Sequence, residues 1–102
     1  MKKVLKFYFE QKEGYLSVVE KGDKYYALVE KETPKVKAIQ DTNHLAVSYE
    51  LKSPNYIDVF VRVIEDENLT KWVFDALAAQ KNLYFKELND ALCVLEIDQE
   101  SR

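Results

Sequence analysis

Apolar and polar residues alternate along much of the chain, and this pattern predicts β-strands. In residues 4–11, "VLKFYFEQ", apolar side chains fall mainly on one side of an extended segment and polar ones mainly on the other. Residues 15–31 contain two strand-forming runs joined by "KGDK", in which Gly22 can adopt the positive φ of a type II′ turn. This part of the chain therefore predicts one strand followed by a β-hairpin.

The second half of the chain predicts three more strands. They are "HLAVSYEL" at residues 44–51, "YIDVFVRVIE" at 56–65 and "ALCVLEID" at 91–98, and a turn at 52–55 joins the first two. The segment 56–65 is partly apolar on both faces, which is expected of a strand that lies centrally in a sheet or contributes to an interface.

Two helices interrupt these strands. A short helix is predicted over residues 33–42, which begin with Thr, a good N-cap, followed by Pro, which is tolerated at the first helical position. Apolar residues at helical spacing predict a longer helix over 66–82, capped by Asp66 or Asn68. The order β-β-β-α-β-β-α-β, with mostly antiparallel strands, indicates a small α+β barrel or strongly curled sheet that forms one domain over residues 1–102.

Charge is unevenly distributed along the 102 residues, whose net charge is −3. Residues 1–37 carry a net charge of +3 and residues 38–102 a net charge of −6. The second value argues against a nucleic-acid surface, which needs a broad cationic face. A small anionic ligand near the N-terminal half fits the asymmetry, and so does a role in dimerisation or solubility.

No sequence feature suggests a membrane protein, because no apolar run approaches the ~20 residues that a membrane-spanning helix needs. The first 13 residues lack the unbroken apolar run of a signal peptide. The single cysteine, Cys93, suits a reducing compartment. We therefore expect a cytoplasmic protein.

No conventional catalytic or metal-binding motif is present. Cys93 lies within an apolar strand segment, where a thiol is ordinarily a small buried hydrophobe. His44 is the only histidine, which excludes a multi-histidine metal site. The acids at 65–67 are better explained as helix-capping residues than as a metal cage. The orientation of Trp72, toward the core or toward an interface, stays open.

Three lysines surround a Thr-Pro step at the start of the short helix. Thr33, Lys35 and Lys37 bring together a hydroxyl, ammonium groups and the unpaired N–H groups of a helix N-terminus, which are the donors that hold a phosphate. Cations here oppose the helix dipole, so an anionic ligand would explain them. A solvated turn that also includes Lys31 is the alternative.

The stretch "TPKVKAIQDTNHLAVSYE" at residues 33–50 resembles the FMN-binding split-barrel family, the pyridoxamine 5′-phosphate oxidase-like proteins. The strand and helix of "YIDVFVRVIEDENLTKWVFDAL" and the closing "ALCVLEID" are similar to later parts of that family, so that the resemblance covers roughly residues 15–98. It implies a mostly antiparallel split barrel with two helices, an FMN cofactor and a homodimer with the cofactor at the subunit interface.

By this resemblance Lys35 would hold the flavin phosphate, with Thr33 as hydroxyl donor and Lys37 as support. The sequence departs from the family pattern at Pro34, where Ser or Arg is usual, and at positions 43–44, where Asn-His replaces Asn-Pro. Two functions are compatible with these features. One is an FMN-dependent oxidoreductase acting on a small molecule; the other is a non-catalytic dimeric barrel, or a small α+β interaction module recruiting a partner by strand addition, without flavin.

Overall fold

The computed structural model describes residues 3–50, 52 and 55–99 of the chain. The strands and helices of this part follow the predicted order β-β-β-α-β-β-α-β. Their bounds are β1 Lys3–Phe9, β2 Lys12–Lys21, β3 Lys24–Glu30, α1 Pro34–Thr42, β4 His44–Ser48, β5 Ile57–Ile64, α2 Glu67–Ala79 and β6 Leu92–Asp98.

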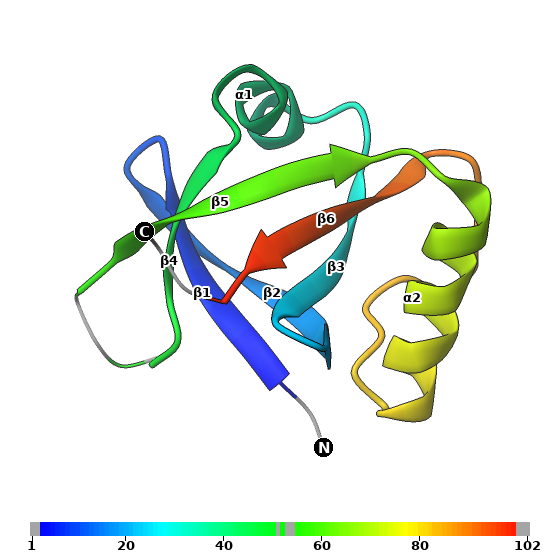
Figure 1. The fold of residues 1–102 in the computed structure, drawn as a ribbon. Helices are drawn as coiled ribbons and strands as arrows, with labels where there is room; N and C mark the ends of the chain where they lie inside the picture. Colours follow the sequence, from blue (N-terminus) through cyan, green and yellow to red (C-terminus); the bar gives the residue numbers. More distant parts are fainter. Residues whose placement is uncertain (1–2, 51, 53–54, 100–102) are drawn as a thin grey trace.

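The strands form a closed antiparallel barrel in the order β1-β2-β3-β6-β5-β4 (Figure 1). Hairpin neighbours make some of the pairings, but the barrel also needs β3 beside β6 and β1 beside β4, which are far apart in the sequence. Each described strand therefore has two neighbours. The predicted small α+β barrel is confirmed, and closure removes the free strand edge on which partner recruitment by strand addition depends.

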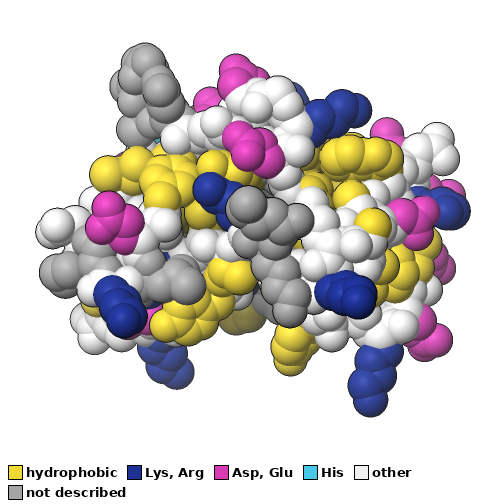
Figure 2. Space-filling view, turned by 90° about the horizontal axis from the view of Figure 1, so that it is seen from below, with side chains coloured by type: hydrophobic (Ala, Val, Ile, Leu, Met, Phe, Trp, Pro, Cys, Tyr) yellow, Lys and Arg dark blue, Asp and Glu magenta, His cyan; other side chains and the backbone are white. Residues whose placement is uncertain are grey.

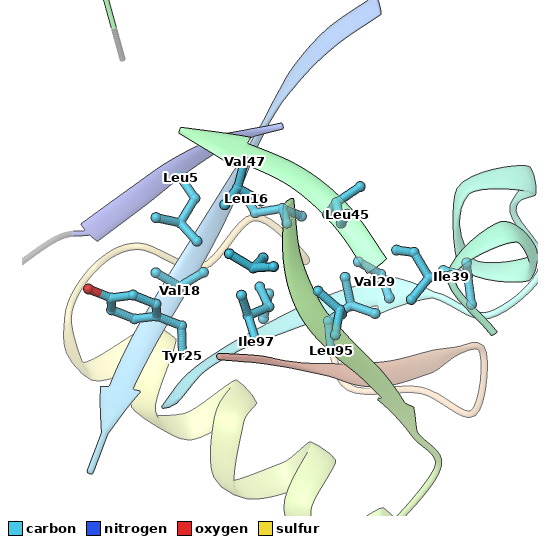
Figure 3. Close-up of a cluster of buried hydrophobic side chains, with 14 of the residues drawn as sticks. Leu5, Leu16, Val18, Tyr25, Val29, Ile39, Leu45, Val47, Leu95 and Ile97 are labelled. Carbon is cyan, nitrogen blue, oxygen red and sulfur yellow. The ribbon is translucent and has the colours of Figure 1, made fainter. Parts of the chain in front are cut away.

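The barrel interior holds the larger of two hydrophobic clusters (Figure 3). Alternate residues of the strands point inward, such as Val18 on β2 and Leu95 on β6, both with no exposed surface. Helix α1 lies at one end of the barrel and adds Val36 and Ile39 to this cluster (Figure 1). Packing of Val36 and Ile39 into the core therefore fixes the position of α1 at this end of the barrel.

Helix α2 lies along the side of the barrel and covers the outer face of β2, β3 and β6 (Figure 1). Val73 and Leu77 of α2 pack there against outward-facing residues such as Leu28 and Val94. Asp66 is the N-cap, since its carboxylate accepts from the backbone N–H groups of the second and third helical residues, at 2.8 and 3.1 Å. Strands β3 and β6 are consequently apolar on both faces.

Trp72 lies at the edge of the contact between α2 and the barrel, outside both hydrophobic clusters. Its ring meets Tyr26 edge-on at 5.9 Å between centroids, and the Lys21 ammonium lies 4.9 Å from the Trp72 ring centroid. Trp72 is 38% exposed, so it lies partly in solvent beside Lys21 of β2 and Tyr26 of β3.

The two hairpin turns differ in how well the sequence predicts them. Gly22 has φ of 62°, as expected for the first central residue of its turn. The β1–β2 turn was not predicted, because its central residues, Glu10 and Gln11, are not turn formers. Their φ values are 50° and 65°, in the left-handed region that costs a non-glycine residue about 1–2 kcal/mol. The turn expected at 52–55 includes Ser53 and Pro54, which lie outside the described residues.

The end of the barrel opposite α1 carries separate patches of hydrophobic side chains between lysines and acids (Figure 2). Both signs of charge occur on this face. None of the helices in the described ranges is long and apolar enough to cross a membrane.

Candidate functional site

An open groove of about 990 Å³ runs along the β1–β2 hairpin. The start of α1, with Thr33 and Lys35, lines one part of it, and Tyr84 and Phe85, from the segment after α2, line another. Its volume is near the upper end of the ~300–1,000 Å³ typical of small-molecule sites. The groove thus joins the predicted phosphate donors to an apolar surface.

Thr33 caps α1 as predicted, and its hydroxyl is already engaged. Thr33 Oγ1 accepts from the Val36 backbone N–H at 3.3 Å and donates to the Glu30 carbonyl at 3.2 Å. Pro34 has no N–H to satisfy. In this first helical turn, the Lys35 backbone N–H is the donor that has no acceptor among the described residues. A phosphate here would gain that N–H directly, and Thr33 would have to exchange its bond to Glu30 for one to the ligand.

The Lys35 side chain is half-buried in the groove. Its Nζ lies 4.2 Å from the centroid of the Phe7 ring, a cation–π geometry. Desolvation by burial lowers the pKa of Lys35 below its ordinary value, and within the described chain no carboxylate oxygen lies within 4.0 Å of its Nζ. An anionic ligand would supply the missing counter-charge and raise that pKa again.

Phe7 can occupy this position because its cross-strand partner is glycine. Phe7 pairs with Gly14 between β1 and β2, and a Cβ on Gly14 would lie 2.4 Å from Phe7 Cζ. Gly14 has no positive φ, so the requirement is for space rather than for an unusual backbone conformation. Gly14, Phe7 and Lys35 therefore form a stack beside the groove. Gly14 and Phe7 were not among the residues predicted from the sequence, although an isolated glycine in a strand signals a close approach of this kind.

The other lysines of the segment point elsewhere. Lys37 is largely exposed, lies 3.7 Å from Glu32 and is not among the groove-lining residues. Lys31 Nζ lies 3.6 Å from a carboxylate oxygen of Glu65, away from the groove. The structure thus brings together Thr33 and Lys35 but not Lys37, which was predicted to support them. The reason is that residues two apart on a helix point about 200° apart.

Aromatic side chains line the groove beyond Lys35. Tyr84 is 85% exposed and meets Phe85 edge-on at 5.2 Å between ring centroids, and Tyr15 of β2 is 61% exposed. Leu28 and Leu77 also line this part of the groove. Exposed aromatic surface beside a cavity suits a flat, apolar ring. Residues 83–90 were not predicted to contribute to a site, although two adjacent aromatic residues in a loop were an available signal.

A fixed negative charge lies on the groove wall at Glu13. The Tyr56 hydroxyl donates to the Glu13 carboxylate, and Lys6 Nζ lies 3.6 Å from it. The hydrogen bond from Tyr56 is the main cause that lowers the pKa of Glu13. Burial and the bond to Glu13 raise the pKa of Tyr56 to about 12. At neutral pH Glu13 is therefore ionised while Tyr56 keeps its proton.

The remaining candidates for chemistry lie away from the groove. Cys93 is fully buried in the barrel core, and burial raises the pKa of its thiol to about 11. His44 is exposed and meets Phe60 edge-on at 6.2 Å between ring centroids. Across the described residues no group of three or more His, Cys, Asp or Glu side chains is arranged to hold a metal ion.

Comparison with known proteins gives likeness in structure only. No family model matches the sequence, and no curated protein matches it. A protein assigned provisionally as a pyridoxamine 5′-phosphate oxidase from Listeria innocua aligns with a TM-score of 0.62 and 20% identity, covering 94% of this chain and 81% of the other. An F420 reductase aligns with a TM-score of 0.64 and 11% identity, covering 99% and 87%.

The general stress protein 26 of Bacillus anthracis aligns with a TM-score of 0.59 and 16% identity over 95% of this chain and 78% of its own. The chain has the split-barrel fold. The resemblance seen in residues 33–50 is therefore confirmed as a likeness of fold. At these identities the fold is what the neighbours establish.

Proposed function

We propose that this split barrel binds FMN and works as a flavin-dependent oxidoreductase in the cytoplasm. The observation that carries the proposal is the position of Lys35, half-buried at the start of α1, lining the groove and without a carboxylate partner in the described chain. A desolvated ammonium at a helix N-terminus is stabilised by a phosphate dianion more than by water.

The two parts of the groove match the two parts of FMN. The Lys35 side chain and its backbone N–H would hold the phosphate, with Thr33 as a further donor after it exchanges its present bond. Tyr15, Tyr84 and Phe85 would contact the ring. When bound, the flavin supplies the redox chemistry, so the chain needs to bind it, orient it and exclude water, and a conventional acid–base or nucleophilic motif is not required.

The redox class draws support from two of the structural neighbours, whose names describe an oxidase and a reductase. A small-molecule substrate would enter through the open side of the groove. The conformation of Tyr84, which extends into solvent, leaves that side accessible.

A second copy of this chain is the expected partner. Tyr8 of β1 and Phe60 of β5 are 42% and 41% exposed on the outer surface of the two strands that flank β4, away from the face that α2 covers. Large apolar side chains grouped on one face of a small domain commonly mark an interface. Analytical ultracentrifugation at micromolar concentration should detect a dimer, and a monomer under these conditions would refute this part of the proposal.

The cofactor is tested by absorbance and titration. The purified protein should be yellow, with an absorbance band at about 450 nm, or should acquire that band when FMN is added and excess ligand is removed. Lys35→Ala should weaken FMN binding at least tenfold, because a charge-assisted phosphate contact contributes ~1.5–3 kcal/mol. Lys37→Ala is the matched control and should change the dissociation constant by less than about twofold.

A colourless protein that takes up no FMN would support the alternative, a non-catalytic dimeric barrel. FMN binding that is equally strong in the Lys35→Ala variant would remove Lys35 from the site while leaving the cofactor assignment in place.

A further inference from the structure

Lys35 differs chemically from the other lysines near the start of α1. Lys31 and Lys37 lie 3.6 and 3.7 Å from carboxylate oxygens of Glu65 and Glu32. No carboxylate oxygen of the described residues lies within 4.0 Å of Lys35 Nζ, although the side chain is half-buried in the groove. Lys35 is therefore the lysine of this segment whose positive charge the described residues do not compensate.

The position of Lys35 favours the neutral amine over the ammonium. Burial removes water from the charged group and lowers the pKa of Lys35. Lys35 also lies in the first turn of α1, where the positive end of the helix dipole opposes a cation. The Phe7 ring acts in the opposite sense, because its face attracts an ammonium, but it carries no charge that could replace a carboxylate. In the empty groove Lys35 is thus easier to deprotonate than an ordinary lysine.

A deprotonated lysine is a nucleophile for carbonyl compounds. An exposed lysine, with a pKa near about 10.4, is almost entirely protonated at neutral pH and reacts slowly. Lysines that form imines in proteins are commonly activated by desolvation in an apolar pocket. Lys35 combines desolvation with access, because its side chain lines an open groove.

The surroundings of Lys35 Nζ suit an aromatic aldehyde. Nζ lies 4.2 Å from the centroid of the Phe7 ring. An aryl group joined to this nitrogen through one carbon would lie beside Phe7, and aromatic rings attract one another at centroid separations of ~4.5–7 Å. Tyr15, Tyr84 and Phe85 supply further aromatic surface in the same groove. An aliphatic aldehyde would gain less from these contacts.

We propose that Lys35 of the ligand-free protein is a carbonyl-reactive site that captures flat aromatic aldehydes as imines. Nζ attacks the aldehyde carbon and forms a C–N bond, while the carbonyl oxygen takes up a proton from water. The carbonyl oxygen and the two hydrogens of the neutral amine then leave as one water molecule, so nothing is oxidised or reduced. A phosphate at Lys35 would keep the amine protonated and cover it, so imine formation and phosphate binding exclude each other.

The test is labelling of the native protein, freed of small molecules, with benzaldehyde and sodium cyanoborohydride at pH 7. The hydride reduces each imine to a stable secondary amine, and peptide mass spectrometry gives the labelling rate at each lysine. Lys35 should be labelled at least about threefold faster than Lys37. Lys37 is the matched internal control, since it lies two residues away on the same helix, largely exposed and next to Glu32.

Three controls separate the environment of Lys35 from its intrinsic reactivity. In guanidinium chloride, where both lysines are solvated, the two rates should agree within about twofold. In the native protein the rate at Lys35 should level off at a lower pH than the rate at Lys37. Propanal in place of benzaldehyde should lower the ratio of the Lys35 rate to the Lys37 rate at least about twofold, because it lacks the ring that contacts Phe7.

Equal labelling of Lys35 and Lys37 in the native protein, or the same pH profile for both, would overturn the inference. An unchanged ratio with propanal would overturn the preference for aromatic aldehydes.

The inference goes beyond the proposed flavin site, and added FMN distinguishes the two. FMN should slow labelling at Lys35 and leave Lys37 unaffected. Fast labelling of Lys35 that FMN does not slow would support the carbonyl site and remove Lys35 from the cofactor site. FMN binding by a protein whose Lys35 reacts no faster than Lys37 would support the cofactor site and overturn the carbonyl site.

Discussion

Replacing Gly14 by alanine tests the stack that holds Lys35. The new Cβ would lie 2.4 Å from Phe7 Cζ and 2.7 Å from Cε2, whereas ordinary carbon contacts begin near about 3.4–3.5 Å. The Phe7 ring must therefore retreat by about 1 Å. Phe7 packs against the barrel core on one side and carries the Lys35 ammonium near its ring, so a shift disturbs both.

The expected loss of stability follows from these contacts. Inserting a methyl group into a tightly packed position costs about 1–3 kcal/mol. Weakening the cation–π contact adds about 0.5–1 kcal/mol at a partly exposed site. We expect Gly14→Ala to lower the free energy of unfolding by roughly 1.5–4 kcal/mol, which in a domain of this size corresponds to a fall in Tm of roughly 4–8 °C per kcal/mol.

Urea unfolding of four proteins measures the effect: wild type, Gly14→Ala, Phe7→Leu and the double variant. Leucine lacks the outer ring atoms that the new Cβ would meet, so the double variant should be more stable than the sum of the single changes predicts. Gly22→Ala, alone and combined with Phe7→Leu, is the matched control. Gly22 has φ of 62° and open space around its Cβ position, so its cost comes from the backbone and Phe7→Leu should not relieve it.

An unfolding free energy for Gly14→Ala within about 0.5 kcal/mol of wild type would refute the steric explanation. Equal rescue of Gly14→Ala and Gly22→Ala by Phe7→Leu would refute it as well.

The other predictions concern the β1–β2 turn and the buried thiol. Gln11→Gly should raise the free energy of unfolding by about 1 kcal/mol, because glycine adopts the φ of 65° without strain; chemical denaturation checks this, and an equal gain in Gln11→Ala would contradict it. Cys93 should not react with Ellman's reagent at pH 8 until the protein unfolds, because its thiol is buried with a pKa near 11. Since the unfolded thiol ionises near its ordinary value of 9.0, the contribution of Cys93 to stability should fall as pH rises from 9.0 to about 11. Cys93→Val should remove that part of the pH dependence, and rapid labelling of the native protein would contradict its burial.

The sequence predicted well where local patterns decide the structure. Alternating residues in 56–65 and helical spacing in 66–82 indicated the right elements with small errors at their ends, because periodicity depends only on which residues face the core. Thr33 and Pro34 marked the start of α1 because capping chemistry involves neighbours in the chain.

The residues that line the groove were only partly predictable, because local patterns reveal only residues that are close together in the sequence. Thr33 and Lys35 could be found because they belong to one segment. The contribution of Phe7 depends on its register with Gly14, which the unpredicted turn at Glu10 and Gln11 sets.

The sequence alone determined the order of strands and helices and the presence of a hydroxyl and an ammonium group at the start of α1. Closure of the barrel, the placement of Tyr84 and Phe85 beside Lys35, and the engagement of Lys31 and Lys37 outside the groove were decided by tertiary structure. The physical reason is distance along the chain. Pairing of β1 with β4 and of β3 with β6 depends on the packing of the whole barrel, and no local pattern records which distant side chains that packing brings together.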